Sequence, residues 1–308
     1  MKDDITKRYK DAVDSLVEKL KTDKTVTAVI LFGSLSYDKV WERSDVDLSV
    51  VVRDDQKLTK KSYCVDEDDI VINVDLMTRA DFIKWTNKSV GGQFSHSLLT
   101  RGTILFTRDE KLHEVLEEAG QIGKTDREMA VLYRAENLIA CMDKCEKWIR
   151  VKEDETYARY YLLNLSNIIA SMELCLHFIS PSREAILQAQ EINPELMCRF
   201  YLYPMNNILN REQILDLLKE ADAYLMKHID IVMKPILAFL KSGEERTVTA
   251  MSKYLKIGGH SLTHLTEYLK NKELIGKTTE TIRITPKGRL IAEEIAYYRL
   301  DEEDEEDF

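Results

Sequence analysis

The sequence has few residues that break regular structure, with 11 glycines and 5 prolines among 308 residues. That scarcity excludes a collagen-like or low-complexity chain, and a hydrophobic content of 44% excludes a disordered one. No apolar run reaches the length of a membrane span, and the N-terminus lacks the apolar stretch of a secretory signal. We therefore expect a cytoplasmic protein of two or three domains.

Cysteines are also few, and the 44 basic residues are outnumbered by 54 acids. The five cysteines include no Cys-x-x-Cys pair, which favours reduced thiols over a disulfide framework or a zinc site. The formal net charge of −10 excludes a chain that binds polyanions over its whole surface.

Residues 1–120 mix the patterns of helices and strands. An amphipathic helix is indicated over 5–20, where apolar residues recur at helical spacing, and a second helix over 81–89. Strands that alternate with helices predict an α/β or α+β layer. The expected strands cover 25–32, 46–52, 70–76 and 102–106.

The rest of the chain changes character twice. Residues 121–242 lose the strand pattern and predict a helical bundle, with a hinge over 120–125. Residues 243–300 predict a smaller third domain, and the tail 301–308 contains seven acids and should be disordered. The third domain is expected to contain helices over 248–255, 261–274 and 289–300 and a hairpin over 275–284.

The most informative segment runs from Gly33-Ser34 to Asp45 and Asp47. The expected buried strand 25–32 is followed by a turn at Gly33 and Ser34, where a phosphate can approach the backbone and accept hydrogen bonds. Asp45 and Asp47 stand two residues apart on the next strand, so both carboxylates project from one face. Adjacent carboxylates repel each other unless cations hold them together, and their hard oxygens suit Mg²⁺.

A third carboxylate, Asp75, lies inside the otherwise apolar strand 70–76. A lone acid there is costly unless it faces a site or a solvated edge. If this strand lies beside 46–52, three carboxylates converge and can hold two metals for an in-line displacement. Acids on a strand edge need no metal, and each element alone is common. The three elements in this order are much more specific.

The elements Gly33-Ser34, Asp45-Val46-Asp47 and Val74-Asp75-Leu76 together resemble the nucleotidyltransferases of the DNA polymerase beta superfamily. The resemblance covers about the first 110 residues, and residues 102–106 are similar to the closing strand of small members. It implies a mixed-sheet catalytic domain. It also implies a transfer of a nucleoside monophosphate from an NTP to a hydroxyl, with release of pyrophosphate.

The same resemblance implies the residues of the site. Two Mg²⁺ ions are expected on Asp45, Asp47 and Asp75, and Asp75 would also help to activate the acceptor hydroxyl. Metals and positioning supply most of the chemistry in such a transfer. The nucleotide contacts are expected at Gly33, Ser34 and Ser44.

The third domain, residues 243–300, resembles a winged helix-turn-helix. Between Arg246 and Ala292 the sequence has nine Lys or Arg and three acids, a net +6 that favours a phosphate-binding face. Winged helices also serve as protein–protein or dimerisation modules, so both interpretations stay open. The candidate nucleic-acid contacts are Ser261, Thr263, His264, Lys277 and Arg283.

The three domains in this order resemble nucleotidyltransferase-like proteins of Bacillus relatives, whose second domain is a helical, substrate-binding-like bundle. We expect an α+β multidomain enzyme, dependent on Mg²⁺, that transfers NMP from an NTP to a hydroxyl of a small molecule or a protein side chain. An RNA end is less favoured, because the first two domains show no basic stripe. The alternative is a nucleotide-sensing regulator that binds DNA through the winged helix and has a weak or inactive catalytic domain.

Overall fold

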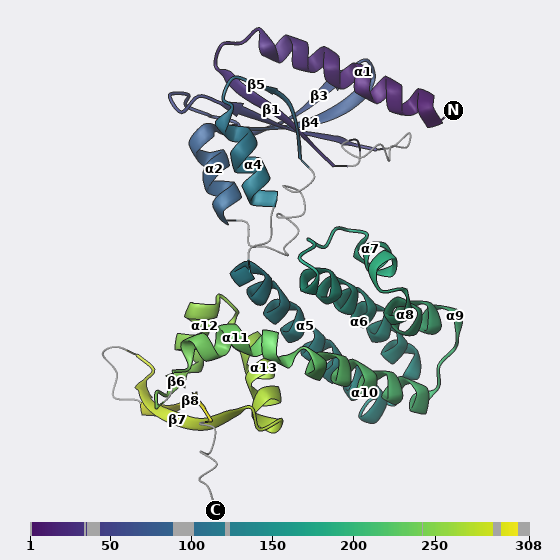
Figure 1. Ribbon diagram of the computed structural model, residues 1–308, viewed down its shortest axis with the longest axis vertical. Coiled ribbons are helices and arrows are strands. Elements are labelled where there is room, and N and C mark those ends of the chain that lie inside the picture. Colours follow the sequence, from purple (N-terminus) through teal and green to yellow (C-terminus); the bar gives the residue numbers. More distant parts are fainter. Residues whose placement is uncertain are drawn as a thin grey trace, which may run out of the picture. The chain divides into compact units, whose positions relative to one another are not determined.

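The computed structural model of the chain describes residues 2–33, 35, 44–88, 102–120, 124–241, 243–285 and 291–300. These residues form two units (Figure 1). The first comprises Met1–Gly123 and Phe178–Arg183, and the second comprises Lys124–His177 and Glu184–Phe308. The stretches expected as second and third domains therefore lie in one unit. The tail 301–308 lies outside the described residues.

A five-stranded sheet with the order β3-β4-β2-β1-β5 forms the centre of the first unit. Its strands are β1 (Val26–Phe32), β2 (Val46–Val52), β3 (Ser62–Glu67), β4 (Ile70–Thr78) and β5 (Thr103–Thr107). Strands β2 and β4 run parallel, and every other neighbouring pair is antiparallel. The four strands expected from the sequence and the mixed sheet of an α+β fold are confirmed.

Helices cover both faces of this sheet. Helix α1 (Lys2–Lys21) packs on one face, and α2 (Arg79–Lys88) and α4 (Lys111–Gly120) pack on the other (Figure 1). Because the central strands β1 and β2 are buried on both sides, their sequences are nearly continuous apolar runs. The helices expected over 5–20 and 81–89 are confirmed.

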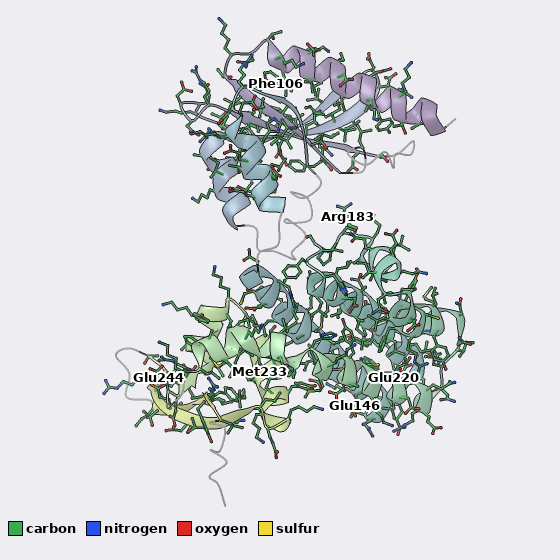
Figure 2. All side chains as sticks on the ribbon, in the orientation of Figure 1. Phe106, Glu146, Arg183, Glu220, Met233 and Glu244 are labelled. Atoms are coloured by element: carbon green, nitrogen blue, oxygen red, sulfur yellow. The ribbon has the colours of Figure 1, made fainter. Side chains whose placement is uncertain are left out.

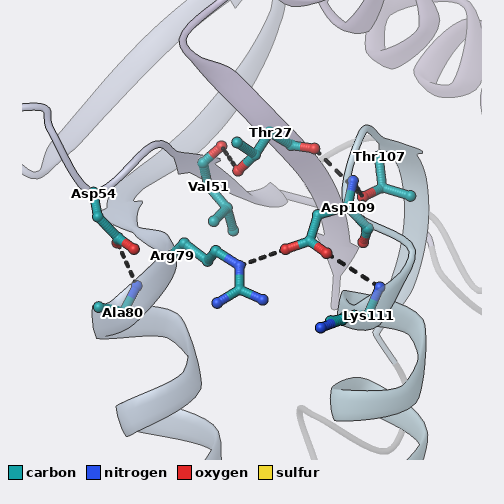
Figure 3. Close-up of polar contacts among 8 residues, drawn as sticks. All are labelled: Thr27, Val51, Asp54, Arg79, Ala80, Thr107, Asp109 and Lys111. Carbon is teal, nitrogen blue, oxygen red and sulfur yellow. Dashed lines mark hydrogen bonds and ion pairs between the residues drawn. The ribbon is translucent and has the colours of Figure 1, made fainter.

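Two aspartates anchor α2 and α4 to the sheet (Figure 3). Asp54 accepts a hydrogen bond of 2.7 Å from the backbone N–H of Ala80, in the first turn of α2. Asp109 accepts one of 3.2 Å from the backbone N–H of Lys111 and also pairs with the guanidinium of Arg79. The hydrogen bond from Arg79 is the main reason why the pKa of Asp109 is below its usual value. These anchors lie at the end of the sheet where β2 and β4 finish.

The second unit begins with two long helices, α5 (Lys124–Arg150) and α6 (Glu155–Leu176). Asp154 ends the turn between them and accepts a hydrogen bond of 2.9 Å from the N–H of Tyr157, which caps α6. The helical character expected here is confirmed. The later helices are α7 (Ala185–Ile192), α8 (Pro194–Met197), a π-helical turn (Cys198–Leu202), α9 (Tyr203–Asn206), α10 (Arg211–Lys227) and α11 (Ile229–Phe239). None of the helices in the described ranges is both long and apolar enough to cross a membrane.

The C-terminal elements pack into the same core as these helices. They are β6 (Arg246–Thr247), α12 (Val248–Leu255), α13 (Gly259–Asn271), β7 (Ile275–Arg283) and β8 (Ile291–Arg299), and the strands form a sheet in the order β6-β8-β7. Leu265 of α13 and Tyr297 of β8 belong to one buried cluster with Leu138 of α5 and Met233 of α11, the last of which is labelled in Figure 2.

The predictions of a hairpin within 275–284 and of a helix over 289–300 are wrong. Residues 275–283 form a single strand, and residues 291–299 pair with it antiparallel. The alanines and glutamates of the second strand favour a helix locally, but its tertiary contacts override that preference. Tyr297 is fully buried and donates a hydrogen bond of 2.8 Å to Glu267, and the ring of Tyr298 lies across Gly276.

Candidate functional site

Three polar side chains lie on one face of the first sheet. In the parallel pair of β2 and β4, Asp47 is opposite Asn73, and Ser49 is opposite Asp75. Val74, between the two polar residues of β4, is buried in the core beneath α1. Since side chains alternate along a strand, Asp47, Asn73 and Asp75 project from the other face. The strand that carries Asp75 therefore lies beside the strand that carries Asp47, which is the condition for their carboxylates to share one site.

The carboxylates of the site influence one another. Asp45, directly before β2, and Asp75 are exposed, whereas Asp47 is half-buried. Burial is the largest influence on Asp47 and raises the pKa of its carboxyl, and the charges of Asp45 and Asp75 act in the same direction. The hydrogen bond from Asn73 and the charge of Arg183 oppose this rise. A cation placed among the carboxylates would favour their ionised forms.

Gly33 brings the backbone close to Asp47. Phe32, the last residue of β1, is paired with Asp47, and the chain then turns at Gly33 with a φ of +81°. A Cβ atom at this position would lie 3.2 Å from Oδ2 of Asp47. Only glycine combines this conformation with an uncrowded carboxylate. The turn therefore leaves room beside Asp47 for a group that approaches the backbone.

A second row of polar side chains extends the site toward the sheet edge. Asn73 donates a hydrogen bond of 3.2 Å to Oδ1 of Asp47. Ser62 and Cys64 of the edge strand β3 are paired with Asp75 and Asn73. The hydroxyl of Ser62 donates a hydrogen bond of 2.6 Å to Oδ1 of Asp75, and Sγ of Cys64 lies 3.5 Å from Oδ1 of Asn73. The site is therefore a polar strip across three neighbouring strands.

Ser62 and Asn73 were not expected from the sequence to be site residues. A signal for Ser62 is present in the sequence, because the acidic turn at 66–69 fixes the register of β3 on β4. Its two turn residues, Asp68 and Asp69, both have positive φ, as in the tight turns that join antiparallel strands. Counting back from that turn places Ser62 opposite Asp75.

The donor atoms of the site fit a hard cation. Asp45, Asp47 and Asp75 offer carboxylate oxygens, which Mg²⁺ prefers, and the burial and mutual repulsion at Asp47 would be relieved by such an ion. Within the part of the chain that the structure describes, no three metal-ligating side chains already stand together as a complete site. Any ion would therefore also need ligands from water or from a bound phosphate.

Of the remaining predicted nucleotide contacts, Ser44 flanks this strip. Ser44 is half-buried and directly precedes Asp45. Ser34 lies outside the described residues. The strip combines carboxylates, an uncrowded glycine turn and the hydroxyl of a serine. These groups can hold a metal-bound phosphate and accept a proton.

Four of the five residues predicted to contact nucleic acid have partners within the second unit. On α13, Nδ1 of His264 lies 3.4 Å from Oδ2 of Asp143, Ser261 is hydrogen-bonded to Glu136, and Thr263 bonds to its own helix. Both acids belong to α5, so this face of α13 packs on the helical bundle. On β7, Lys277 forms an ion pair of 2.5 Å with Glu267, whereas Arg283 is exposed at the strand end.

Comparisons with known proteins show what the chain and its fold are similar to. Residues 14–111 match the family model described as polymerase beta, nucleotidyltransferase. No curated protein matches the chain significantly. Among solved structures, the chain is similar to a nucleotidyltransferase-like protein from Exiguobacterium sibiricum 255-15, with a TM-score of 0.64 and 15% sequence identity. That match covers 94% of this chain and 99% of the other, and it shows a shared fold.

Proposed function

We propose that the chain, whose residues 14–111 match the polymerase beta nucleotidyltransferase family model, transfers a nucleoside monophosphate from an NTP to a hydroxyl acceptor and releases pyrophosphate. The observation that carries the proposal is the placement of Asp47 and Asp75 on one face of the neighbouring parallel strands β2 and β4, with Asp45 close enough for its charge to act on Asp47 and with Gly33 against Asp47. A domain with these three carboxylates and this uncrowded turn has the groups that nucleotidyl transfer needs.

Each residue of the strip has a defined task in this proposal. Asp45, Asp47 and Asp75 would hold Mg²⁺, which when bound neutralises the phosphate charge and supports the leaving pyrophosphate. Gly33, with Ser34 and Ser44, gives the phosphates access to the backbone. Asn73 orients the carboxylate of Asp47 through its hydrogen bond. Asp75, the more exposed of the two strand carboxylates, receives the proton of the acceptor hydroxyl.

The acceptor that we propose is a hydroxyl of a small molecule or of a protein side chain. We also infer a winged helix over 243–300, on the support of the order of α12, α13, β7 and β8. A regulator that binds DNA through this module has no specific support, because Ser261, His264 and Lys277 already have partners in the chain.

Thermal unfolding with each of the four NTPs, with and without MgCl₂, tests the proposal without knowledge of the acceptor. A nucleotide at about a hundred times its Kd should add roughly 2.7 kcal/mol of stability. The gain should require Mg²⁺ and should vanish in Asp45→Ala/Asp47→Ala. The matched control is Asp66→Ala, which removes an exposed acid of β3 that is paired with Val71. Unchanged unfolding with every nucleotide would contradict the proposal.

A further inference from the structure

The hydroxyl of Ser62 occupies a special position in the strip. It donates a hydrogen bond of 2.6 Å to Oδ1 of Asp75, the carboxylate that would receive the proton of an acceptor. Both residues are exposed, so water is available to each of them and burial does not require this bond. Under the proposed function, an acceptor hydroxyl must come to the same carboxylate. Ser62 therefore already makes the hydrogen bond to Asp75 that the hydroxyl of an acceptor would have to make.

The fold selects Ser62 from the neighbouring hydroxyls. The register of β3 on β4 sets Ser62 directly opposite Asp75, and β3 is an edge strand of the sheet. Ser49 is opposite Asp75 on the other side, on β2, but it is buried and only 5% exposed. Thr59 is exposed but precedes the paired part of β3. Ser62 thus combines access to solvent with contact to Asp75.

We propose that Ser62 is itself an acceptor, so that the chain attaches a nucleoside monophosphate to its own Ser62. The inference rests on the proposed function and names a protein serine as one acceptor of the same site. Oγ of Ser62 forms a bond to the α-phosphorus of a bound NTP, and its proton passes to Asp75. The bond between the α-phosphorus and the bridging oxygen breaks, and pyrophosphate leaves with that electron pair. The product is a phosphodiester on Ser62.

The nucleotide attached to Ser62 would also inhibit further reaction at this site. The attached nucleotide would carry a negative charge next to Asp75 and would fill the space that another acceptor needs. Like charges at short distance repel, so the modified chain should bind a further NTP more weakly. Self-modification would then be fastest when no other acceptor competes for Asp75.

Intact-protein and peptide mass spectrometry test the inference on the full chain. The native protein is incubated with each of the four NTPs and MgCl₂, and nucleotide binding is followed in the same samples by thermal unfolding. We expect a mass gain of one nucleoside monophosphate on the peptide that contains Ser62. Ser62→Ala should abolish the gain, Asp75→Asn should slow it by about 10²–10⁴-fold, and the control Thr59→Ala should keep it. The rate constant should not depend on protein concentration, because donor site and acceptor lie in one chain.

The possible results separate a failure of this inference from a failure of the proposed function. A nucleotide that stabilises the protein without any mass gain at Ser62 would overturn this inference and leave the proposed function intact. A mass gain that survives in Ser62→Ala, or a rate that rises with protein concentration, would also overturn it. If none of the four NTPs stabilises the protein, the proposed function fails and this inference fails with it.

Discussion

Replacing Gly33 with alanine tests whether the turn after β1 exists to leave Asp47 uncrowded. The backbone at Gly33 has a φ of +81°, so any other residue there is strained by about 1–2 kcal/mol. The new methyl group would also lie 3.2 Å from Oδ2 of Asp47, and the carboxylate would have to move by a few tenths of an ångström. Gly33→Ala should therefore lose both stability and nucleotide affinity.

Gly243→Ala is the matched control for this prediction. Gly243 has a similar φ of +74°, but an added Cβ would meet nothing within 4 Å. The control should show the strain, measured as a loss of about 1–2 kcal/mol in urea unfolding, without any effect on the site.

The loss of affinity can be estimated from the contact that the displacement weakens. Moving a carboxylate that holds the metal-bound phosphate should weaken that charged contact by about 1.4 kcal/mol, which corresponds to about tenfold in nucleotide affinity. At a concentration of about a hundred times the native Kd, the stabilisation by Mg²⁺ and NTP would then fall from roughly 2.7 to roughly 1.4 kcal/mol. Thermal unfolding of both variants measures this difference. Full stabilisation of Gly33→Ala by nucleotide would refute the role given to the turn.

Three further predictions concern the strip, the helix anchors and the thiols. Asn73→Ala should reduce the nucleotide-dependent gain in stability by about 1 kcal/mol, because Asp47 loses the hydrogen bond that orients it; an undiminished gain in thermal unfolding would argue against that role. Asp109→Asn should cost about 1 kcal/mol at pH 7. Arg79 holds the pKa of Asp109 in the folded chain below the usual 3.8. The stabilisation is therefore present when the pH is above 3.8, and it is lost as the pH falls through the lower pKa of the folded chain. Urea unfolding of the native and variant proteins should therefore converge in acid, and a constant difference down to about pH 2 would count against the pairing. In the folded chain, iodoacetamide should alkylate the exposed thiols quickly. It should alkylate the buried thiols only in denaturant, because burial raises their pKa to about 11 or 12. Rapid labelling of a buried thiol in the folded chain would contradict the packing. The exposed thiols are those of Cys64 and Cys198, and the buried ones are those of Cys141, Cys145 and Cys175.

The carboxylates of the site were predictable because they depend on local patterns. A period of two puts Asp45 and Asp47 on one face of a strand, and the apolar context of Asp75 marks it as unusual. The partners of those carboxylates depend on strand pairing. The parallel pairing of β2 with β4 crosses a long connection, and no local residue encodes the contact of Asn73 with Asp47.

The C-terminal region shows where local preference fails. Residues 289–300 are rich in alanine and glutamate, which favour a helix, yet 291–299 form a strand. The contact of Tyr298 with Gly276 and the burial of Tyr297 exist only after the two strands have met. The packing of His264 against Asp143 of α5 was equally beyond the sequence, because it joins segments more than a hundred residues apart.

Titration calorimetry tests whether Asp45, Asp47 and Asp75 form the site for a metal-bound nucleotide. The NTP that stabilises the protein most is titrated into the native chain in MgCl₂ and again in EDTA, and then into Asp45→Asn/Asp47→Asn and into Asp75→Asn in MgCl₂. Binding to the native chain that requires Mg²⁺ and is lost or strongly weakened in both variants would agree with the account. Binding of equal affinity in EDTA, or in variants that lack these carboxylates, would contradict it.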